Sequence, residues 1–155
     1  NPITVKMPKE KSLAEKLEHQ LEQSLQQGAK LILGGERENC NFQPTLIDFV
    51  TVDSVAFQEE TFGPLATVIR AKDENDAVTI ANNHRYGLAS SIWTKDLENA
   101  FQLARKMEAG NVFVNSLVRS DSRVPFGGIK KSGYGRELGT VGIKEFMNMK
   151  SLIIE

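Results

Sequence analysis

Leucines recur at every fourth position near the start of the chain: Leu13, Leu17, Leu21 and Leu25. Residues four apart lie on one face of an α-helix, so this spacing predicts an amphipathic helix. Pro8 suits its first turn and Gly28 suits a C-terminal stop. The remaining positions are mostly Glu, Gln and Lys, which predicts a solvated face. We interpret the helix as a packing element without chemistry of its own.

Short apolar runs alternate with amphipathic segments along the rest of the chain. The runs predict strands over residues 31–33, 45–50, 65–69, 89–94, 111–115 and 149–153. Helical patterns fall over residues 73–83, 96–109 and 140–146. The run at 65–69 is apolar enough to predict burial on both faces. This alternation favours an α/β fold with a parallel sheet, in which ligands gather at the carboxyl ends of strands.

The composition is that of an ordinary globular domain, with 155 residues, 40% of them hydrophobic and 25% charged. A net charge of −1 gives no drive toward nucleic acid or a membrane surface. The charge is uneven, because residues 1–100 carry ten Lys and Arg against fifteen Asp and Glu, whereas residues 101–155 carry nine against five. The basic end suits an anionic ligand or an acidic partner surface, and the second interpretation needs fewer assumptions.

The single cysteine, Cys40, excludes an intramolecular disulfide and suits a reducing compartment, so we expect a cytoplasmic protein. Cys40 stands in a polar loop without a histidine nearby, and we interpret it as an incidental thiol rather than a nucleophile. No apolar run approaches the ~20 residues of a membrane span, and no signal peptide is visible. The chain begins at Asn1 rather than at a methionine, which leads us to expect a piece of a longer protein.

The stretch from Val124 to Gly139 holds five of the twelve glycines, together with Phe126 and Arg136. Glycine is favoured where the backbone turns with positive φ or lies close against another surface, so we expect an ordered functional loop rather than a linker. The alternative is a structural turn without a ligand. The stretch lacks the Gly-x-x-x-x-Gly-Lys-Ser/Thr spacing of a phosphate-binding loop. It also lacks the dinucleotide fingerprint, because the glycine after the Gly-Tyr-Gly triplet comes one position too late.

Four sequence blocks stand out beyond the first forty residues. They are Glu59-Glu60-Thr61-Phe62-Gly63-Pro64, the segment from Asn83 through Tyr86-Gly87-Leu88-Ala89 with Thr94 after it, Ala109-Gly110-Asn111-Val112-Phe113-Val114-Asn115, and Pro125-Phe126-Gly127-Gly128 with Lys130, Ser132-Gly133 and Gly135-Arg136-Glu137-Leu138-Gly139. In order and spacing these blocks resemble the NAD(P)-dependent aldehyde dehydrogenase superfamily, and the last is similar to its C-terminal signature. The first forty residues match only loosely.

The resemblance implies an α/β fold that is the parallel-sheet part of an aldehyde dehydrogenase-like catalytic domain. Residues 1–147 would form the C-terminal portion of that domain, and residues 148–155 a C-terminal oligomerisation-arm strand. The implied reaction oxidises an aldehyde to a carboxylate: a cysteine thiolate attacks the carbonyl, and hydride passes to NAD or NADP. An apolar terminal strand needs a partner, which agrees with a homo-oligomer. We expect no nucleic-acid or membrane partner.

By resemblance, Glu60 accepts hydrogen bonds from the nicotinamide-side ribose, and Phe62 packs beside the nicotinamide. A carboxylate suits a vicinal diol because it accepts two hydrogen bonds at once. Adjacent side chains diverge, so we expect only one of Glu59 and Glu60 to face a pocket. The family's nucleophilic cysteine motif and general-base glutamate are missing from this sequence. We therefore assign no catalytic residue and no metal site, and we expect the chain alone to be inactive.

The loop at residues 116–129 follows a predicted strand end and could shape a substrate mouth, with Asn115, Ser122, Arg123 and Phe126 as candidate contacts. Its segment Ser120-Asp121-Ser122-Arg123 resembles the succinate-semialdehyde branch of the family. A carboxylated aldehyde needs a cation and hydroxyl donors at its far end, which Arg123, Arg119 and Ser122 can supply. The alternative is that these are solvated loop residues.

Two other functions stay open. The chain could be a non-catalytic α/β association module that uses its first helix and terminal strand. It could also be a different α/β enzyme, in which Glu59 or Glu60 and Lys130 perform acid–base work on an anionic substrate. A shifted pKa at Glu59, Glu60 or Lys130 would favour the different α/β enzyme.

Overall fold

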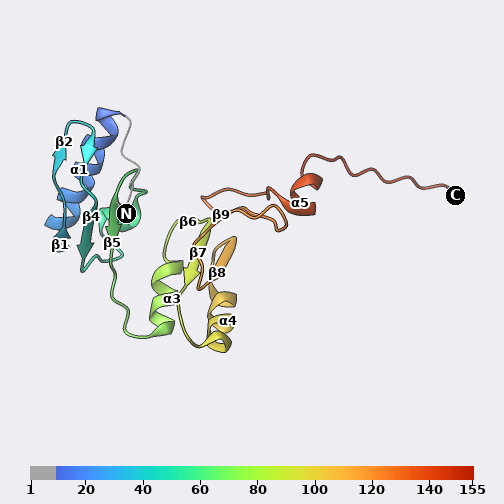
Figure 1. Cartoon of the computed structure of the whole chain (residues 1–155). Coiled ribbons are helices and arrows are strands. Elements are labelled where there is room, and N and C mark those ends of the chain that lie inside the picture. The colour runs from blue at the N-terminus through green and yellow to red at the C-terminus, as the bar shows by residue number, and fades with distance from the viewer. Residues whose placement is uncertain (1–9) are drawn as a thin grey trace. The chain divides into compact units, whose positions relative to one another are not determined.

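The structure is a computed structural model that describes residues 10–155 and divides into two compact units. The first unit ends at Asp73, and the second runs from Glu74 to Glu155 (Figure 1). Each unit has sheets of its own, so each is described by itself. The expected lead-in at residues 1–7 and the expected helix start at Pro8 lie outside the described residues.

Helix α1 (Lys11–Gln26) forms one wall of the core of the first unit, which confirms the predicted helix. Its buried positions are Ala14, Leu17, Gln20, Leu21 and Ser24. The chain leaves the helix at Gly28, whose φ of 104° favours glycine. The prediction that the Glu, Gln and Lys positions form a solvated face is wrong at Gln20, which is buried.

Three strands form the main sheet of the first unit: β1 (Lys30–Leu33), β4 (Thr45–Asp48) and β5 (Leu65–Thr67). The central strand, β4, is antiparallel to β1 and parallel to β5. The predicted parallel sheet is therefore mixed, since the short connection from β1 to β4 reverses the chain instead of crossing over. In β5 only Leu65 is buried, so the prediction of burial on both faces is wrong for this chain.

Two small elements of the first unit have no signal in the hydrophobic pattern. The predicted loop at residues 36–44 contains a hairpin of β2 (Arg37–Glu38) and β3 (Asn41–Phe42), which places Phe42 fully inside the core. Helix α2 (Val55–Gln58) is a single turn, too short to show a helical period. Both elements depend on contacts with the rest of the unit.

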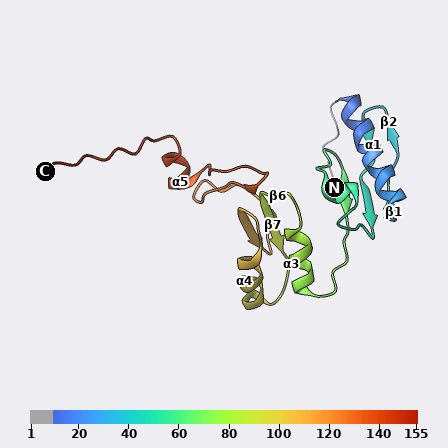
Figure 2. The same ribbon diagram turned by 180° about the vertical axis from the view of Figure 1, so that it is seen from behind.

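The second unit contains a strand–helix–strand arrangement: β7 (Ala89–Ile92), α4 (Leu97–Lys106) and β8 (Asn111–Val114). The two strands are parallel, as predicted. Helix α3 (Glu74–Asn82) contacts α4, and Figures 1 and 2 show the two helices beside this strand pair. Helix α4 begins after Asp96, whose carboxylate accepts the backbone N–H of Asn99 at 2.9 Å.

The rest of the second unit holds β6 (Tyr86–Gly87), paired antiparallel with β9 (Ile129–Lys130), and the short helix α5 (Gly139–Lys144). Residues 148–155 form no strand within this chain, and their apolar side chains are exposed. Figure 1 shows this segment extending away from α5. Pairing of the segment with another subunit stays a prediction.

Candidate functional site

The segment after α2 separates the two adjacent carboxylates that the sequence singled out. The carboxylate of Glu59 accepts a hydrogen bond from Gln20 Nε2 at 2.8 Å and lies 3.6 Å from Lys16 Nζ. Glu60 is exposed, and its carboxylate makes no hydrogen bond or ion pair with any residue from 10 to 155. Glu59 therefore anchors the segment, whereas the Glu60 carboxylate is available to a ligand.

Phe62 follows on the same segment, and 62% of its surface is exposed. The segment then returns to the sheet, where Pro64 C=O accepts the backbone N–H of Thr45 at 2.8 Å. An exposed aromatic ring on a segment fixed at both ends offers a flat apolar surface to a ligand. Glu60 and Phe62 thus present an acceptor and an apolar face two residues apart.

The Gly-rich stretch of the second unit is an ordered loop, as expected. Phe126 and Glu137 exchange backbone hydrogen bonds of 2.8 Å in both directions. Arg136 Nη1 donates to the carbonyls of Gly128 at 2.8 Å and Gly135 at 2.7 Å. Ser132 Oγ accepts the backbone N–H of Gly87 at 3.0 Å, which ties the loop to β6. In this chain the Arg136 side chain binds the loop's own backbone.

Close backbone contact explains why glycine is needed beside this loop. A Cβ built on Gly110 would overlap the carbonyl oxygen of Gly127, and Asn111 Nδ2 donates to that same oxygen at 2.8 Å. The start of β8 therefore lies directly against the loop. Any larger side chain at position 110 would push the loop away.

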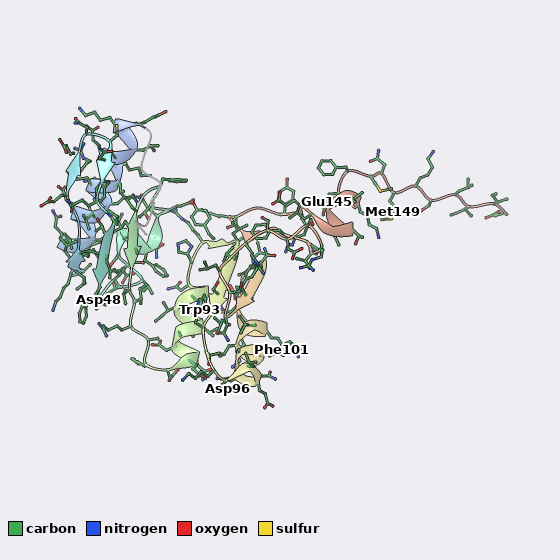
Figure 3. All side chains as sticks on the ribbon, in the orientation of Figure 1. Asp48, Trp93, Asp96, Phe101, Glu145 and Met149 are labelled. Atoms are coloured by element: carbon green, nitrogen blue, oxygen red, sulfur yellow. The ribbon has the colours of Figure 1, made fainter. Side chains whose placement is uncertain are left out.

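An open hollow of about 560 Å³ lies over this loop. Its walls combine aromatic and charged side chains with loop backbone: Leu88, Phe126, Tyr134, Arg136, Glu145 and Phe146, with Gly127, Gly128 and Gly135. Of the predicted site residues only Phe126 lines it, and this ring is half-buried. Figure 3 labels Glu145, which follows α5 at this end of the unit.

Asn115 lies at the end of β8, as predicted, with a positive φ of 50°. Its Oδ1 accepts the backbone N–H of Thr94 at 2.9 Å, and its Nδ2 donates to the Thr94 carbonyl at 2.8 Å. The amide thus joins the ends of the two parallel strands. This structural contact occupies both ends of the side chain that the sequence proposed for substrate.

Arg123 lies in the exposed loop with 84% of its side chain in solvent and is held by Asp121. Nε and Nη2 of Arg123 donate to the two carboxylate oxygens at 2.9 and 2.6 Å, and the backbone N–H of Arg123 adds a third bond of 2.9 Å. The side-chain hydrogen bond raises the pKa of Arg123 and holds the pKa of Asp121 well below its usual range. Ser122 is exposed, and its carbonyl accepts the backbone N–H of Gly139 at 3.1 Å.

The groups of the acid–base alternative have other tasks. Lys130 Nζ donates to the carbonyls of Asn82 at 2.7 Å and His84 at 3.2 Å, and it pairs with Glu108 at 2.6 Å. Lys130 therefore caps the C-terminal end of α3. Cys40 lies in the turn between β2 and β3, and residues 10–155 contain no cluster of three or more His, Cys, Asp or Glu side chains placed to hold a metal ion.

The candidate residues fall into two sets. Glu60 and Phe62 belong to the first unit, whereas Asn115, Ser122, Arg123 and Phe126 belong to the second. Sequence reasoning missed the anchoring role of Gln20, which no local pattern signals. The Asp121–Arg123 pair did have a signal, since opposite charges two residues apart in a loop can meet directly.

The model of the aldehyde dehydrogenase family matches residues 8–152, so the chain belongs to the aldehyde dehydrogenase family. The match spans nearly the whole chain and includes both sets of candidate residues.

Curated relatives include succinate semialdehyde dehydrogenases. The protein Sad of Escherichia coli K12, whose name carries NAD(P)+, is 45% identical over 143 residues, covering 90% of this chain and 31% of the relative. An enzyme of Deinococcus radiodurans, whose name carries NADP(+), is 40% identical over 140 residues, covering 88% and 29%. The chain thus spans about a third of the length of these relatives.

Solved structures of aldehyde dehydrogenases are also similar to this chain. Betaine aldehyde dehydrogenase from Staphylococcus aureus, crystallised with NAD+, has a TM-score of 0.83 and 34% identity, covering 87% of this chain and 28% of that chain. An NAD-dependent aldehyde dehydrogenase from Sinorhizobium meliloti also has a TM-score of 0.83, with 38% identity over the same shares. These values give the length of the shared segment, so its assignment to the C-terminal part of the longer enzymes stays a prediction.

No helix within residues 10–155 is long and apolar enough to cross a membrane.

Proposed function

We propose that this chain is part of an NAD(P)+-dependent aldehyde dehydrogenase that oxidises succinate semialdehyde. The observation that carries the proposal is the exposed carboxylate of Glu60, which has no partner within residues 10–155, near the exposed ring of Phe62 in a chain of this family. The names of these relatives support succinate semialdehyde as the substrate and a nicotinamide nucleotide, NAD+ or NADP+, as the cofactor.

Glu60 and Phe62 fit one end of a nicotinamide nucleotide. A carboxylate without a protein partner can accept both hydroxyls of a ribose diol, and an exposed aromatic ring can cover one face of the nicotinamide. When bound, NAD(P)+ accepts the hydride that leaves the substrate carbon. The contribution of this chain is to orient the nucleotide and to exclude water from that face.

The chain alone is proposed to be inactive. Its only cysteine, Cys40, lies in a hairpin turn of the first unit, and Gly, Gln and His are absent from its immediate neighbours. The thiolate nucleophile of the proposed reaction must therefore come from another part of a longer enzyme. The same holds for the general base.

We assign the distal carboxylate of the substrate to the loop at residues 116–129. Arg123 is already neutralised by Asp121, whereas the exposed guanidinium of Arg119 makes no hydrogen bond or ion pair within residues 10–155. Ser122 offers a hydroxyl donor, Phe126 an apolar wall and Asn115 a rigid strand end. Arg119→Ala and Arg123→Ala should raise KM for succinate semialdehyde more than for butanal. Equal changes in KM for both aldehydes would contradict the proposed contact between this loop and the substrate carboxylate.

The main experiment compares three preparations. The native gene product, the 155-residue chain and its Cys40→Ser variant are each assayed with succinate semialdehyde and NAD+ or NADP+, by following the reduced nucleotide. We expect turnover by the native product and none by the two short chains. Turnover by the short chain would overturn the proposed inactivity, and no turnover by the native product would overturn the proposed function.

Association is the second candidate function, favoured by exposed apolar side chains in residues 148–155. Met149, Leu152, Ile153 and Ile154 are each at least 80% exposed. We propose that this segment pairs with another subunit of the same protein. Deleting residues 149–155 should lower the mass measured by light scattering, with no dependence on nucleotide; an unchanged mass would count against this assembly mode.

A further inference from the structure

Helix α1 buries polar side chains that an apolar packing helix would not need. Gln20 is 2% exposed and lies between Leu17 and Leu21 on the buried face. Its Nε2 donates to Glu59 Oε2 at 2.8 Å and to the backbone carbonyl of Glu60 at 3.5 Å. Burial of an amide is tolerated only when it is hydrogen-bonded, and here its donors are directed at the candidate cofactor segment.

Ser24 in α1 and Gln27, the residue directly after the helix, continue the same row four and seven residues after Gln20. Ser24 Oγ accepts the backbone N–H of Ala56 at 3.0 Å and donates to the Gln20 carbonyl at 2.8 Å. Gln27 Oε1 accepts the backbone N–H of Val55 at 2.9 Å. Residues spaced in this way share a helix face, so we call Gln20, Ser24 and Gln27 the polar row of α1.

The polar row replaces the usual cap of α2. The first N–H groups of a helix have no partner within it, and Ser54 is a common residue type at the N-cap. Here Ser54 Oγ accepts the backbone N–H of Thr51 at 3.1 Å instead. The free N–H groups of α2 are satisfied from α1, and Gln20 fixes the residues that follow α2. All three side chains therefore act on the single segment 55–60.

We propose that Gln20, supported by the rest of the polar row, is a positioning residue that presents Glu60 to the nicotinamide nucleotide. This inference rests on the proposed function, because it requires Glu60 to contact the cofactor. Gln20 binds the carboxylate of Glu59 and the backbone carbonyl of Glu60, so the exposed Glu60 carboxylate keeps no partner among the described residues. Its role is indirect, through the backbone of the segment.

The test replaces Gln20 by Met in the native gene product, with Gln26→Met as the matched control. Gln26 is on the same helix but exposed. We expect Gln20→Met to raise the Kd for NAD+ or NADP+, measured by calorimetry, by about five- to tenfold, the effect of one lost hydrogen bond to a charged group. The KM for succinate semialdehyde should stay the same. Amide hydrogen exchange at residues 55–60 should increase, and the control should leave all three quantities unchanged.

A charge exchange keeps the proposal testable if Gln20→Met folds poorly. Gln20→Glu alone places two carboxylates together and should weaken nucleotide binding, whereas Gln20→Glu with Glu59→Gln restores the hydrogen bond in reverse and should recover it. Faster exchange at residues 55–60 with unchanged nucleotide Kd would overturn the positioning role. Glu60→Gln distinguishes failure of the positioning role of Gln20 from failure of the proposed cofactor contact. If Glu60→Gln leaves the nucleotide Kd unchanged, the contact between Glu60 and the cofactor is contradicted as well.

Discussion

The two units of this chain reach order by different means. The first unit has a closed apolar core made by helix, hairpin and sheet: Ala14, Leu17, Leu21, Ala29, Phe42, Ile47, Val50, Ala56 and Leu65. Among the described residues of the second unit, only Ala100 joins the buried apolar set. A unit of similar length can therefore be organised without an enclosed core of its own.

The second unit relies on close backbone contacts and leaves large apolar side chains in solvent. Its exposed apolar residues include Trp93, Leu97, Phe101, Phe146 and Met149, of which Figure 3 labels three. An exposed surface of this kind marks an interaction site. The first unit thus holds the proposed cofactor segment against an enclosed apolar core, whereas the second unit leaves large apolar side chains exposed.

The largest expected effect is loss of the core of the first unit. Phe42→Ala removes a fully buried ring and should lower the free energy of unfolding by about 3–5 kcal/mol. Phe101→Ala is the matched change in the second unit, where the ring is 64% exposed, and should cost less than ~0.5 kcal/mol in the isolated chain. Urea denaturation followed by circular dichroism measures both. Similar losses would break the contrast between the units.

The next effect tests close backbone packing in the second unit. Gly110→Ala forces a methyl group against the carbonyl of Gly127 and should cost about 1–3 kcal/mol. Gly133→Ala meets open space but adopts a φ of 107°, so its cost should be only ~1 kcal/mol. The same denaturation assay applies. If Gly110→Ala lowers the free energy of unfolding no more than Gly133→Ala does, the contact at position 110 does not organise the loop.

A smaller effect is expected from the cap on α3. Lys130→Met removes donors from the carbonyls of Asn82 and His84 and should destabilise the second unit by ~1 kcal/mol. Lys131→Met is the control, since that side chain is exposed and only its backbone N–H is used, to Arg85 C=O. Hydrogen exchange in residues 74–87 reports the local loss. Equal exchange in both variants would remove the capping role.

The smallest effect concerns the loop pair Asp121–Arg123 and its dependence on pH. Because Arg123 lowers the pKa of Asp121, the pair stabilises the folded loop above the ordinary carboxyl pKa of ~4, and this contribution is lost as the pH falls toward the lowered value. Arg123→Ala should raise the pKa of Asp121, although the backbone N–H of residue 123 and the charge of Arg119 still hold it below the ordinary value. Carbon NMR titration of the Asp121 carboxyl measures it, and an unchanged low pKa would mean that another group holds the charge.

Much of the fold could be predicted because its signals are local. The leucine spacing marked α1, and the apolar runs marked β1, β4, β7 and β8 within a few residues. The order of the glycine-containing blocks indicated the family, which the family match confirms. The direction of β1 against β4 was missed because strand pairing is a long-range choice that the period of a strand does not encode.

Only part of the candidate site could be predicted from the sequence. The positions of Glu60 and Phe62 came from resemblance, but the division of labour between the adjacent carboxylates came from Gln20, which lies 39 residues from Glu59 in the chain. Arg123 was marked as a cation, yet its neutralisation by Asp121 became visible only in the geometry of the loop.

The sequence by itself determined the longer helices, the main strands and the family, since periodicity, turn residues and ordered motifs are properties of neighbouring residues. The tertiary structure alone decided that Gln20 of α1 is buried, that the sheet of the first unit is mixed and that the Glu60 carboxylate has no partner within residues 10–155. These outcomes depend on which distant groups satisfy one another once water is excluded. A buried donor must find its acceptor wherever the fold places it, and the order of residues along the chain does not state that place.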